Sequence, residues 1–367
     1  MRLKLRGIMK IKRITYGGFR NLEQLTVTPH EGVNIIYGEN AQGKTNILEG
    51  IWLFSGLKSF RGAKDRELVA FSKNRAKLTS VFETSQRENR AEIVIDGRRR
   101  ASLNGVELNG ASGLIGKFGA VVFSPSFMSV VKEGPSERRR FIDAAICQLK
   151  PSYAVMLTQY KRLLVQRAAV LKDTQKNPSL YQMLEIIDEK AAFEGDRITE
   201  ERVQYIRRLS PFVTDIYSGL SGGREEIGFS YTAKNRSEGE TLLDALARLR
   251  SEDIMTGATS AGPHRDDIDI KINGVSARTF GSQGQQRSCA LAMKLAEASV
   301  ISSVRNEQPV MLLDDVMSEL DESRQDYILN HIKNGQVFIT CCDPASVLRL
   351  CEGRTFRIKN GGVTDVS

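Results

Sequence analysis

The chain has 367 residues, and its 53 Lys and Arg against 44 Asp and Glu give a formal net charge of +9 at pH 7. This length can bury a large core and divide into two or three lobes, and the basic balance favours a polyanionic partner such as nucleic acid or an anionic membrane surface. No apolar stretch is long enough to cross a bilayer, and the segment Met1–Gly7 lacks a hydrophobic signal core, so we expect a cytoplasmic protein without a membrane partner.

The five cysteines are odd in number and scattered, and they form no C-x-x-C pair. They therefore predict buried thiols, and neither a disulfide framework nor a zinc site. The three histidines lie far apart in the chain, which leaves no obvious histidine metal centre.

The segment 38–45, GENAQGKT, fits the pattern G-x-x-x-x-G-K-[ST]. The apolar run 33–37 predicts a buried strand before it, and 46–54 predicts a helix after it. In such a loop the backbone N–H groups turn towards phosphate oxygens, Lys44 offers its charge to the β- and γ-phosphates, and Thr45 offers a hydroxyl to Mg²⁺. The alternative is a glycine-containing turn before an ordinary helix. The predicted nucleotide-binding residues are Gly38, Glu39, Asn40, Ala41, Gln42, Gly43, Lys44 and Thr45.

Residues 9–123 have the pattern of mixed strands and helices. The segments 77–82 and 91–95 alternate apolar and polar residues, and Asp96-Gly97 and Asn104-Gly105 are turn sequences. These features predict an antiparallel sheet beside the nucleotide-binding lobe.

From Pro151 apolar residues recur at three- and four-residue steps, and a second helical run follows Asn177-Pro178-Ser179. The pattern predicts a helical hairpin whose first helix, at about 1.5 Å per residue, is roughly 30 Å long. This hairpin is either an ordinary helical subdomain or a recognition arm. The strand pattern returns at 267–272, where we expect the chain to complete the sheet of the nucleotide lobe. We therefore predict a discontinuous head, 1–123 and 237–367, around a helical insertion, 124–236.

The run 309–315 is apolar and ends in two carboxylates, as in a central parallel strand whose C-terminal end faces the phosphates. Asp314 is predicted to help hold Mg²⁺, and Asp315 to orient or deprotonate the attacking water. The alternative is a strand end in a second lobe. The loop at residue 38 favours the nucleotide interpretation.

A glycine-containing turn, 281–287, runs into a helical segment and offers a second anion cradle around Ser282. Together with the loop, the Asp-Asp strand and the segment 318–321, it resembles the head of ABC-type ATPases. The resemblance implies that two copies meet head to tail, and that Ser282, with Gly284 and Gln285, caps the γ-phosphate held by the opposite copy. The alternative is a polar helix cap. The residues predicted to be catalytic are Lys44, Asp314, Asp315 and Ser282.

Five separated segments narrow the resemblance to the bacterial RecF family, relatives of the SMC heads. They are 18–22, 58–61, 123–125, 134–143 and 262–267. The fold implied is an α/β P-loop NTPase of the ABC-ATPase or SMC-head type, with an antiparallel β-subdomain and an inserted helical lobe that carries a short helical hairpin.

The RecF resemblance also implies a function. We expect an ATP-dependent homodimer that binds single-stranded, double-stranded and gapped DNA, with RecO and RecR as partners in loading RecA. The implied processes are recombinational repair, replication restart and the SOS response to DNA damage.

The chain departs from the family pattern at several points, and residues 1–8 precede the usual start, so Met9 is an alternative start. Phe60 replaces a histidine, and Ser126-Phe127 replaces an acidic pair. Thr340-Cys341 stands where a transporter has its switch histidine, and Asp315 is one methylene shorter than the usual glutamate. We therefore expect slow hydrolysis, with ATP acting chiefly as a dimerisation switch.

Arginines are the candidate DNA contacts: Arg61 by the SMC resemblance, and Arg98, Arg99 and Arg100 as a basic triplet that could follow phosphates. The alternative for the triplet is a solvated hairpin face. The second triplet, 138–140, is flanked by acidic residues and predicts internal salt bridges. Neither triplet is interleaved with aromatic residues, so we expect DNA recognition by charge and shape. His264 is assigned either to the architecture of its loop or to communication between nucleotide and DNA.

Two other functions remain open at this stage. One is the nucleotide-binding subunit of an ABC transporter, and the other is a non-hydrolysing scaffold for repair proteins.

Overall fold

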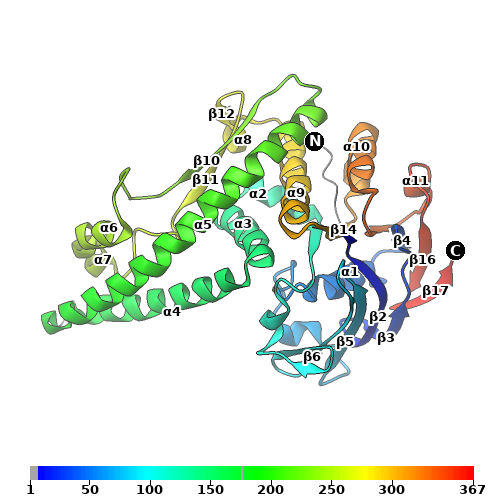
Figure 1. Ribbon diagram of the computed structural model, residues 1–367, viewed down its shortest axis with the longest axis horizontal. Coiled ribbons are helices and arrows are strands. Elements are labelled where there is room, and N and C mark those ends of the chain that lie inside the picture. The colour runs from blue at the N-terminus through cyan, green and yellow to red at the C-terminus, as the bar shows by residue number, and fades with distance from the viewer. Residues whose placement is uncertain (1–6, 175–176) are drawn as a thin grey trace. The chain divides into compact units, whose positions relative to one another are not determined.

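The computed structural model describes residues 7–174 and 177–367, which form two compact units (Figure 1). The first unit runs to Phe127 and resumes at Leu291–Ser367, and the second is Met128–Ala290. Residues 1–6 lie outside the described residues, so the choice between Met1 and Met9 as the start stays a prediction.

A six-stranded sheet with the order β17-β16-β4-β15-β14-β9 forms one layer of the first unit. Its strands run parallel except for the β16–β17 pair. All five residues of β14 are buried, as a central parallel strand requires. The predictions of a strand at 33–37 and of a central parallel strand within 309–315 are therefore confirmed. The strands are β4 (Val33–Tyr37), β9 (Ala120–Phe123), β14 (Val310–Asp314), β15 (Val337–Cys341), β16 (Arg354–Lys359) and β17 (Gly362–Val366).

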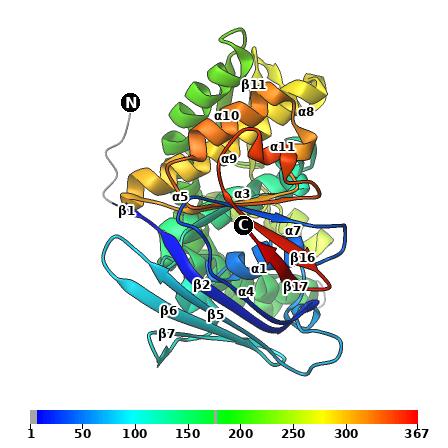
Figure 2. The ribbon, with the colours of Figure 1, turned by 90° about the vertical axis from the view of Figure 1, so that its right-hand side faces the viewer.

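A second sheet, antiparallel, has the order β3-β2-β5-β6-β7-β8 (Figure 2). Tyr16, Leu78 and Ile93 are register partners across its three central strands, and all three are fully buried. The predicted antiparallel subdomain is confirmed. The strands are β2 (Lys10–Phe19), β3 (Leu22–Val27), β5 (Ala76–Glu83), β6 (Glu88–Ile95), β7 (Arg99–Leu103) and β8 (Val106–Glu107).

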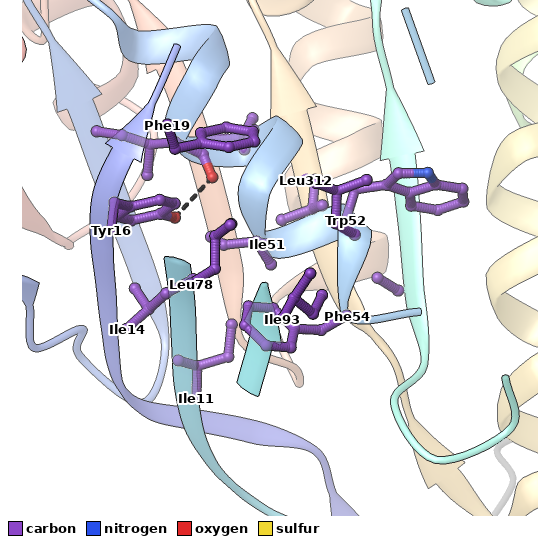
Figure 3. Packing of buried hydrophobic residues seen from close by; sticks show 14 of the residues in the cluster. Ile11, Ile14, Tyr16, Phe19, Ile51, Trp52, Phe54, Leu78, Ile93 and Leu312 are labelled. Carbon is purple, nitrogen blue, oxygen red and sulfur yellow. Dashed lines mark hydrogen bonds between the residues drawn. The ribbon is translucent and has the colours of Figure 1, made fainter. Parts of the chain in front are cut away.

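The helix α1 (Lys44–Leu53) carries apolar side chains that meet β2, β5 and β6 as well as Leu312 of β14 (Figure 3). The Tyr16 hydroxyl donates a hydrogen bond to the Ile47 carbonyl oxygen at 2.7 Å. Gly50 makes this close approach possible, because a Cβ there would collide with the Tyr16 ring and lie 2.9 Å from Leu78 Cδ2. The helix that begins at the predicted phosphate loop is thus fixed between both sheets.

Shorter elements complete the first unit. The strand β1 (Gly7–Ile8) pairs in parallel with β13 (Glu307–Gln308). The remaining helical segments are η1 (Asp65–Leu68), η2 (Ala111–Leu114), η5 (Met317–Glu319), α10 (Glu322–Ile332) and α11 (Ala345–Leu348). Two segments cross the division between the units, η3 (Pro125–Met128) and α9 (Gln283–Arg305).

The second unit is mostly helical, and its longest elements are the antiparallel pair α4 (Pro151–Thr174) and α5 (Tyr181–Ser221) (Figure 1). This pair confirms the predicted hairpin, and the 41 residues of α5 span about 60 Å at 1.5 Å per residue. The other elements are α2 (Ser129–Lys132), α3 (Pro135–Leu149), η4 (Pro178–Leu180), α6 (Leu242–Arg248), α7 (Arg250–Thr256), α8 (Ala277–Phe280), β10 (Ile227–Thr232), β11 (Asp267–Ile272) and β12 (Val275–Ser276). Within the described ranges, no helix is both long enough and apolar enough to span a bilayer.

The strand predicted at 267–272 exists as β11, but the expectation that it completes the nucleotide-lobe sheet is wrong. It pairs with β10 and β12 in a separate three-stranded antiparallel sheet of the second unit. Ile268, Ile270 and Ile272 alternate with more exposed residues, as in a strand with one buried face. The observed division accordingly differs from the predicted one: residue 237 falls inside the second unit, which extends to Ala290.

Candidate nucleotide-binding site

The loop between β4 and α1 depends on its two glycines. Gly38 has φ +151°, and a Cβ there would collide with the Ile358 carbonyl oxygen. Gly43 has φ +110°, and its Cβ would lie 2.7 Å from Asn21 Oδ1. Side chains rarely adopt such positive φ values, so the close neighbours and the backbone conformation both require glycine.

The outer side of the loop is held by the turn between β16 and β17. Gln42 Oε1 accepts a hydrogen bond from the backbone N–H of Asn360 at 2.6 Å, and the N–H of Gly361 donates to the Gln42 carbonyl at 3.1 Å. The Gln42 side chain is therefore bound to this turn. Gln42 can contribute to the predicted phosphate cradle through its backbone N–H.

Lys44 is the first residue of α1 and only 8% exposed. Its ammonium group donates to the carbonyl oxygens of Gly38 at 2.6 Å and Glu39 at 2.8 Å. The first turn of α1 contains no acidic residue, and its N-cap makes no side-chain hydrogen bond. The loop thus combines the positive end of a helix, uncapped N–H groups and one ammonium group, a combination that suits a polyphosphate.

Asp314 and Thr45, the two predicted Mg²⁺ ligands, lie together at the end of β14. The Thr45 hydroxyl donates to Asp314 Oδ1 at 2.7 Å, and the Thr340 hydroxyl donates to the same oxygen at 2.9 Å. Burial raises the pKa of the Asp314 carboxyl above its ordinary value, and the two hydroxyls oppose that shift. A hydroxyl and a carboxylate are hard oxygen donors, so this pair fits Mg²⁺, which usually takes one or two protein ligands and completes its shell with phosphates and water.

Asp315 faces different neighbours from Asp314. Its φ of +54° places it in the left-handed region, and its backbone N–H donates to the Thr340 hydroxyl at 2.9 Å. The Ser318 hydroxyl lies 3.3 Å from Asp315 Oδ1 and donates to the Asp315 carbonyl at 2.9 Å. The two adjacent carboxylates therefore sit in distinct environments.

Thr340 links both aspartates, and sequence reasoning missed this role. The position was noted only because it lacks the switch histidine of transporters. A threonine at the end of an apolar strand, in a chain that also has an Asp-Asp strand end, was the available signal.

We expect Thr340→Val to lower the free energy of unfolding by about 1–3 kcal/mol, because it removes the acceptor of the Asp315 N–H and one donor to buried Asp314. Valine keeps the size and branching of threonine. Urea unfolding of the variant beside Thr340→Ser checks this. Serine keeps the hydroxyl and loses only a buried methyl group, so Thr340→Ser is expected to be the less destabilised of the two. Equal unfolding midpoints for all three proteins would contradict it.

The prediction of buried thiols holds for Cys147, Cys289 and Cys341. It is met only in part by the half-buried Cys351 and is wrong for Cys342, which is exposed. Cys342 Sγ lies 3.9 Å from Lys44 Nζ and 3.3 Å from Asn40 Oδ1. It follows β15, whose C-terminal end lies beside the phosphate loop, and sequence spacing did not reveal this proximity.

Arg61, the predicted DNA contact, lies beside α1. Its guanidinium donates to Asn46 Oδ1 at 3.0 Å and is 3.7 Å from the fully buried Glu49 carboxylate. Glu49 also accepts two hydrogen bonds of 2.9 Å from Arg20. The Arg61 charge is close enough to Asp314 to act against the rise in its pKa. Arg61 is therefore part of the surroundings of the nucleotide site, and its contact with DNA stays a prediction.

The first basic triplet does not present three equivalent cations. Arg98 is exposed, whereas Arg99 is bound internally to the Leu57 carbonyl and to Asp65, at 2.8 Å each. Arg100 forms an ion pair with Asp96. DNA contact by Arg98 stays a prediction. The same role for Arg99 or Arg100 would require these partners to be exchanged for phosphates.

The second triplet confirms the prediction of internal salt bridges. Arg138 is buried and makes a bidentate pair with Asp267, with bonds of 2.7 and 2.9 Å. Arg139 donates to the Asp266 carbonyl at 2.6 Å. Arg140 lies 3.8 Å from Glu137, one of the flanking acidic residues.

In the second unit, Ser282 precedes α9 in a reciprocal capping arrangement. Its hydroxyl accepts from the Gln285 N–H at 3.2 Å, and Gln285 Oε1 accepts from the Ser282 N–H at 2.7 Å. Gln285 Nε2 also donates to Glu225 at 2.7 Å. The helix-cap alternative thus describes the local geometry. Ser282 and Gly284 nevertheless remain exposed at the start of a 23-residue helix.

His264 has the hydrogen-bonded position expected of a structural loop residue. Its Nδ1 lies 2.9 Å from the Tyr160 hydroxyl and its Nε2 lies 3.1 Å from the Thr259 carbonyl. Burial lowers the pKa of His264 to about 4, so the neutral imidazole predominates at pH 7.

Known proteins resemble this chain over most of its length. The family model described as "RecF/RecN/SMC N terminal domain" matches residues 10–358. The chain is 40% identical over 335 residues to the "DNA replication and repair protein RecF" of Agathobacter rectalis. The matched region covers 91% of this chain and 92% of that relative. It is 39% identical over 364 residues to the protein of that name from Clostridium acetobutylicum, covering 97% and 100%.

Solved structures give the same result. The "recombination mediator protein RecF-ATP in RecFOR pathway" is 35% identical to this chain, with a TM-score of 0.92, and the match covers 100% of both chains. The RecF-ATPrS structure has a TM-score of 0.91, and the match covers 98% of this chain and 99% of that chain. An Smc head domain from Pyrococcus furiosus, 16% identical with a TM-score of 0.55 over 98% and 96%, shares the fold. The predicted fold class is confirmed, and the chain belongs to the RecF family of DNA replication and repair proteins.

Proposed function

We propose that this chain is an ATP-dependent DNA-binding protein of recombinational repair and replication restart. ATP binding joins two copies head to tail on gapped DNA or at junctions of single and double strands. The observation that carries the proposal is the 2.7 Å bond between Thr45 and Asp314 beside the loop of Lys44. Relatives of the chain are named as DNA replication and repair proteins, and a similar solved protein is named with ATP.

The nucleotide part of the proposal assigns one role to each group. The N–H groups of 38–45 and the Lys44 ammonium hold the phosphates, and Thr45 and Asp314 hold Mg²⁺, whose charge assists phosphoryl transfer when bound. Asp315 orients or deprotonates the attacking water. Hydrolysis is slow, because Asp315 is shorter than the usual glutamate and no histidine stands at Thr340-Cys341.

The assembly part of the proposal assigns Ser282 to the phosphate of a second copy. It stands exposed at the N-terminus of α9, where backbone N–H groups favour an anion. A ligand shifts an equilibrium only by its differential affinity for the two states. The γ-phosphate must therefore make contacts in the closed dimer that it lacks in the monomer.

DNA and repair proteins are the proposed partners. The net charge of +9 supports a polyanionic partner. The similar solved protein is described as part of the RecFOR pathway, which supports RecO and RecR as partners in RecA loading. We infer action on cytoplasmic DNA, without a membrane partner.

ATP hydrolysis measured with and without gapped DNA, beside light scattering with and without ATP, tests the proposal. The expected result is slow, DNA-stimulated turnover and an ATP-dependent dimer. A turnover of tens per second would contradict the switch. Complete absence of hydrolysis would favour the repair scaffold, and co-purification with membranes would favour the transporter subunit.

A further inference from the structure

Phe71 is an aromatic side chain without apolar cover. Its relative exposure is 114%, the highest among the exposed large hydrophobic residues. It lies between η1 and the start of β5, at the tip of a turn in which the Lys73 N–H donates to the Ala70 carbonyl at 2.9 Å. A phenylalanine side chain fully in water contributes no apolar burial to folding.

The turn that carries Phe71 is held by the antiparallel sheet. The Ala70 N–H donates to the Gly18 carbonyl at 2.9 Å, and Val69 forms a bridge with Phe19 of β2. Ala70 itself is buried, with 6% exposure. The base of the turn is therefore fixed, and the aromatic ring projects from a defined support.

Three cationic side chains lie near Phe71 in the sequence and are available for a contact with an external partner. Arg66, Lys73 and Arg75 are exposed, and within 7–174 and 177–367 none of their charged groups has a hydrogen bond or an ion pair. The segment 68–75 contains no acidic residue. The stem of Lys73 also lies against Gly18, which places this lysine beside the same sheet support.

The exposed aromatic ring together with the exposed cations distinguishes this surface from an ordinary exposed apolar residue. Single surface hydrophobics are common and need no partner. Proteins that bind single-stranded nucleic acid, however, combine aromatic rings on which bases stack with cations that follow the phosphates. In duplex DNA the bases are already stacked on one another, so a lone ring on a turn suits an unstacked base.

We propose that Phe71 stacks on an unpaired base of single-stranded DNA, and that Lys73 and Arg75 contact the phosphates on either side. This inference rests on the proposed DNA binding and names the part of a gapped substrate that the head reads. It adds base stacking to the expected recognition by charge and shape, because this basic segment, unlike the two arginine triplets, carries an exposed aromatic residue.

A tryptophan reporter tests the stacking directly. The chain has one tryptophan, Trp52, which is 5% exposed, so Phe71→Trp adds a solvent-exposed fluorophore at the tip of the turn. A thymine oligonucleotide is expected to quench this added emission. An abasic oligonucleotide of the same length keeps the phosphates but has no bases, and it is expected to bind without quenching.

Binding measurements supply the second arm. Phe71→Ala is expected to weaken binding of the thymine oligonucleotide by roughly 5- to 150-fold, the effect of losing one stacked base, while duplex affinity stays unchanged. Phe71→Tyr keeps the ring and is expected to bind like the parent. Lys73→Gln with Arg75→Gln is expected to reduce the slope of log affinity against log salt by about 1.4, which is 0.7 for each lost contact.

The outcomes separate the inference from the proposed function. If the parent protein binds no DNA, the proposed function fails. If the parent binds DNA but Phe71→Ala binds single strands equally well, or Phe71→Trp is not quenched, the inference is overturned. A Phe71→Ala variant that loses dimerisation but keeps its affinity for single strands would assign the ring to a protein contact and also overturn it.

Discussion

Lys44→Ala is expected to weaken ATP binding at least about 100-fold. The Lys44 ammonium lies at the mouth of the phosphate loop and is only 8% exposed, so a phosphate that replaces its carbonyl partners would be poorly screened by water. Hydrogen bonds to charged groups contribute about 1.5–3 kcal/mol each, and this ammonium can donate more than one. Titration calorimetry with ATP and Mg²⁺ measures the loss.

The matched control for this experiment is Lys190→Ala. Lys190 is an exposed lysine on α5, in the other compact unit, and its loss removes the same charge from the protein. The control is expected to bind ATP like the parent, and both variants are expected to unfold at the parent's temperature. If Lys44→Ala binds ATP with an affinity within threefold of the parent's, the phosphate loop is not the ATP-binding site.

Asp315→Asn is expected to accumulate the ATP-bound dimer. Asparagine has the size of aspartate and keeps an oxygen for Ser318, and the backbone bond to Thr340 does not involve the side chain. The amide cannot accept the proton of the attacking water, and such proton transfers contribute about 10²- to 10⁴-fold to rates. Light scattering at saturating ATP should therefore show a dimer that outlasts the parent's dimer by at least about 100-fold.

Asp314→Asn is the contrasting variant. It changes the proposed Mg²⁺ ligand at the neighbouring position, so it is expected to weaken ATP–Mg²⁺ binding and to yield no dimer. If Asp315→Asn stays monomeric at saturating ATP while still binding the nucleotide, nucleotide state does not control assembly and the switch proposal fails.

Local patterns were sufficient for the elements around the phosphate loop. The strand at 33–37 is apolar except for Asn34, the strand at 310–314 is apolar up to Asp314, and both have neighbours on each side in a mostly parallel sheet. The hairpin of α4 and α5 followed from helical periodicity, because each helix buries a stripe along its length. Such signals lie within one segment and need no knowledge of its partner.

Which strands pair with one another could not be predicted in the same way. The alternation at 267–272 indicates that one face of this strand is buried. A strand of the nucleotide sheet and a strand paired with β10 in the separate sheet would both show this pattern. The boundary placed at residue 237 failed to match the compact units for the same reason. Pairing between distant strands is decided by packing of the whole unit, which a local period does not record.

The candidate site shows the same limit. Residues 38–45 and 314–315 form contiguous motifs and were predicted. Thr340 instead reaches Asp314 from the neighbouring strand β15, and Cys342, directly after β15, lies beside Lys44 although 298 positions separate the two residues. Phe71 belongs to no periodic pattern, and only its exposure singles it out.

The contact between Gly50 and Tyr16 restricts which residues positions 16 and 50 can hold in this family. Any larger residue at position 50 would need a smaller ring at position 16, and a smaller side chain there would also give up the hydroxyl that bonds to the Ile47 carbonyl. Leu78, which lines the same gap, would have to adjust as well. Positions 16, 50 and 78 are therefore expected to vary together among homologues, as a covarying triplet separated by as many as 62 positions in the sequence.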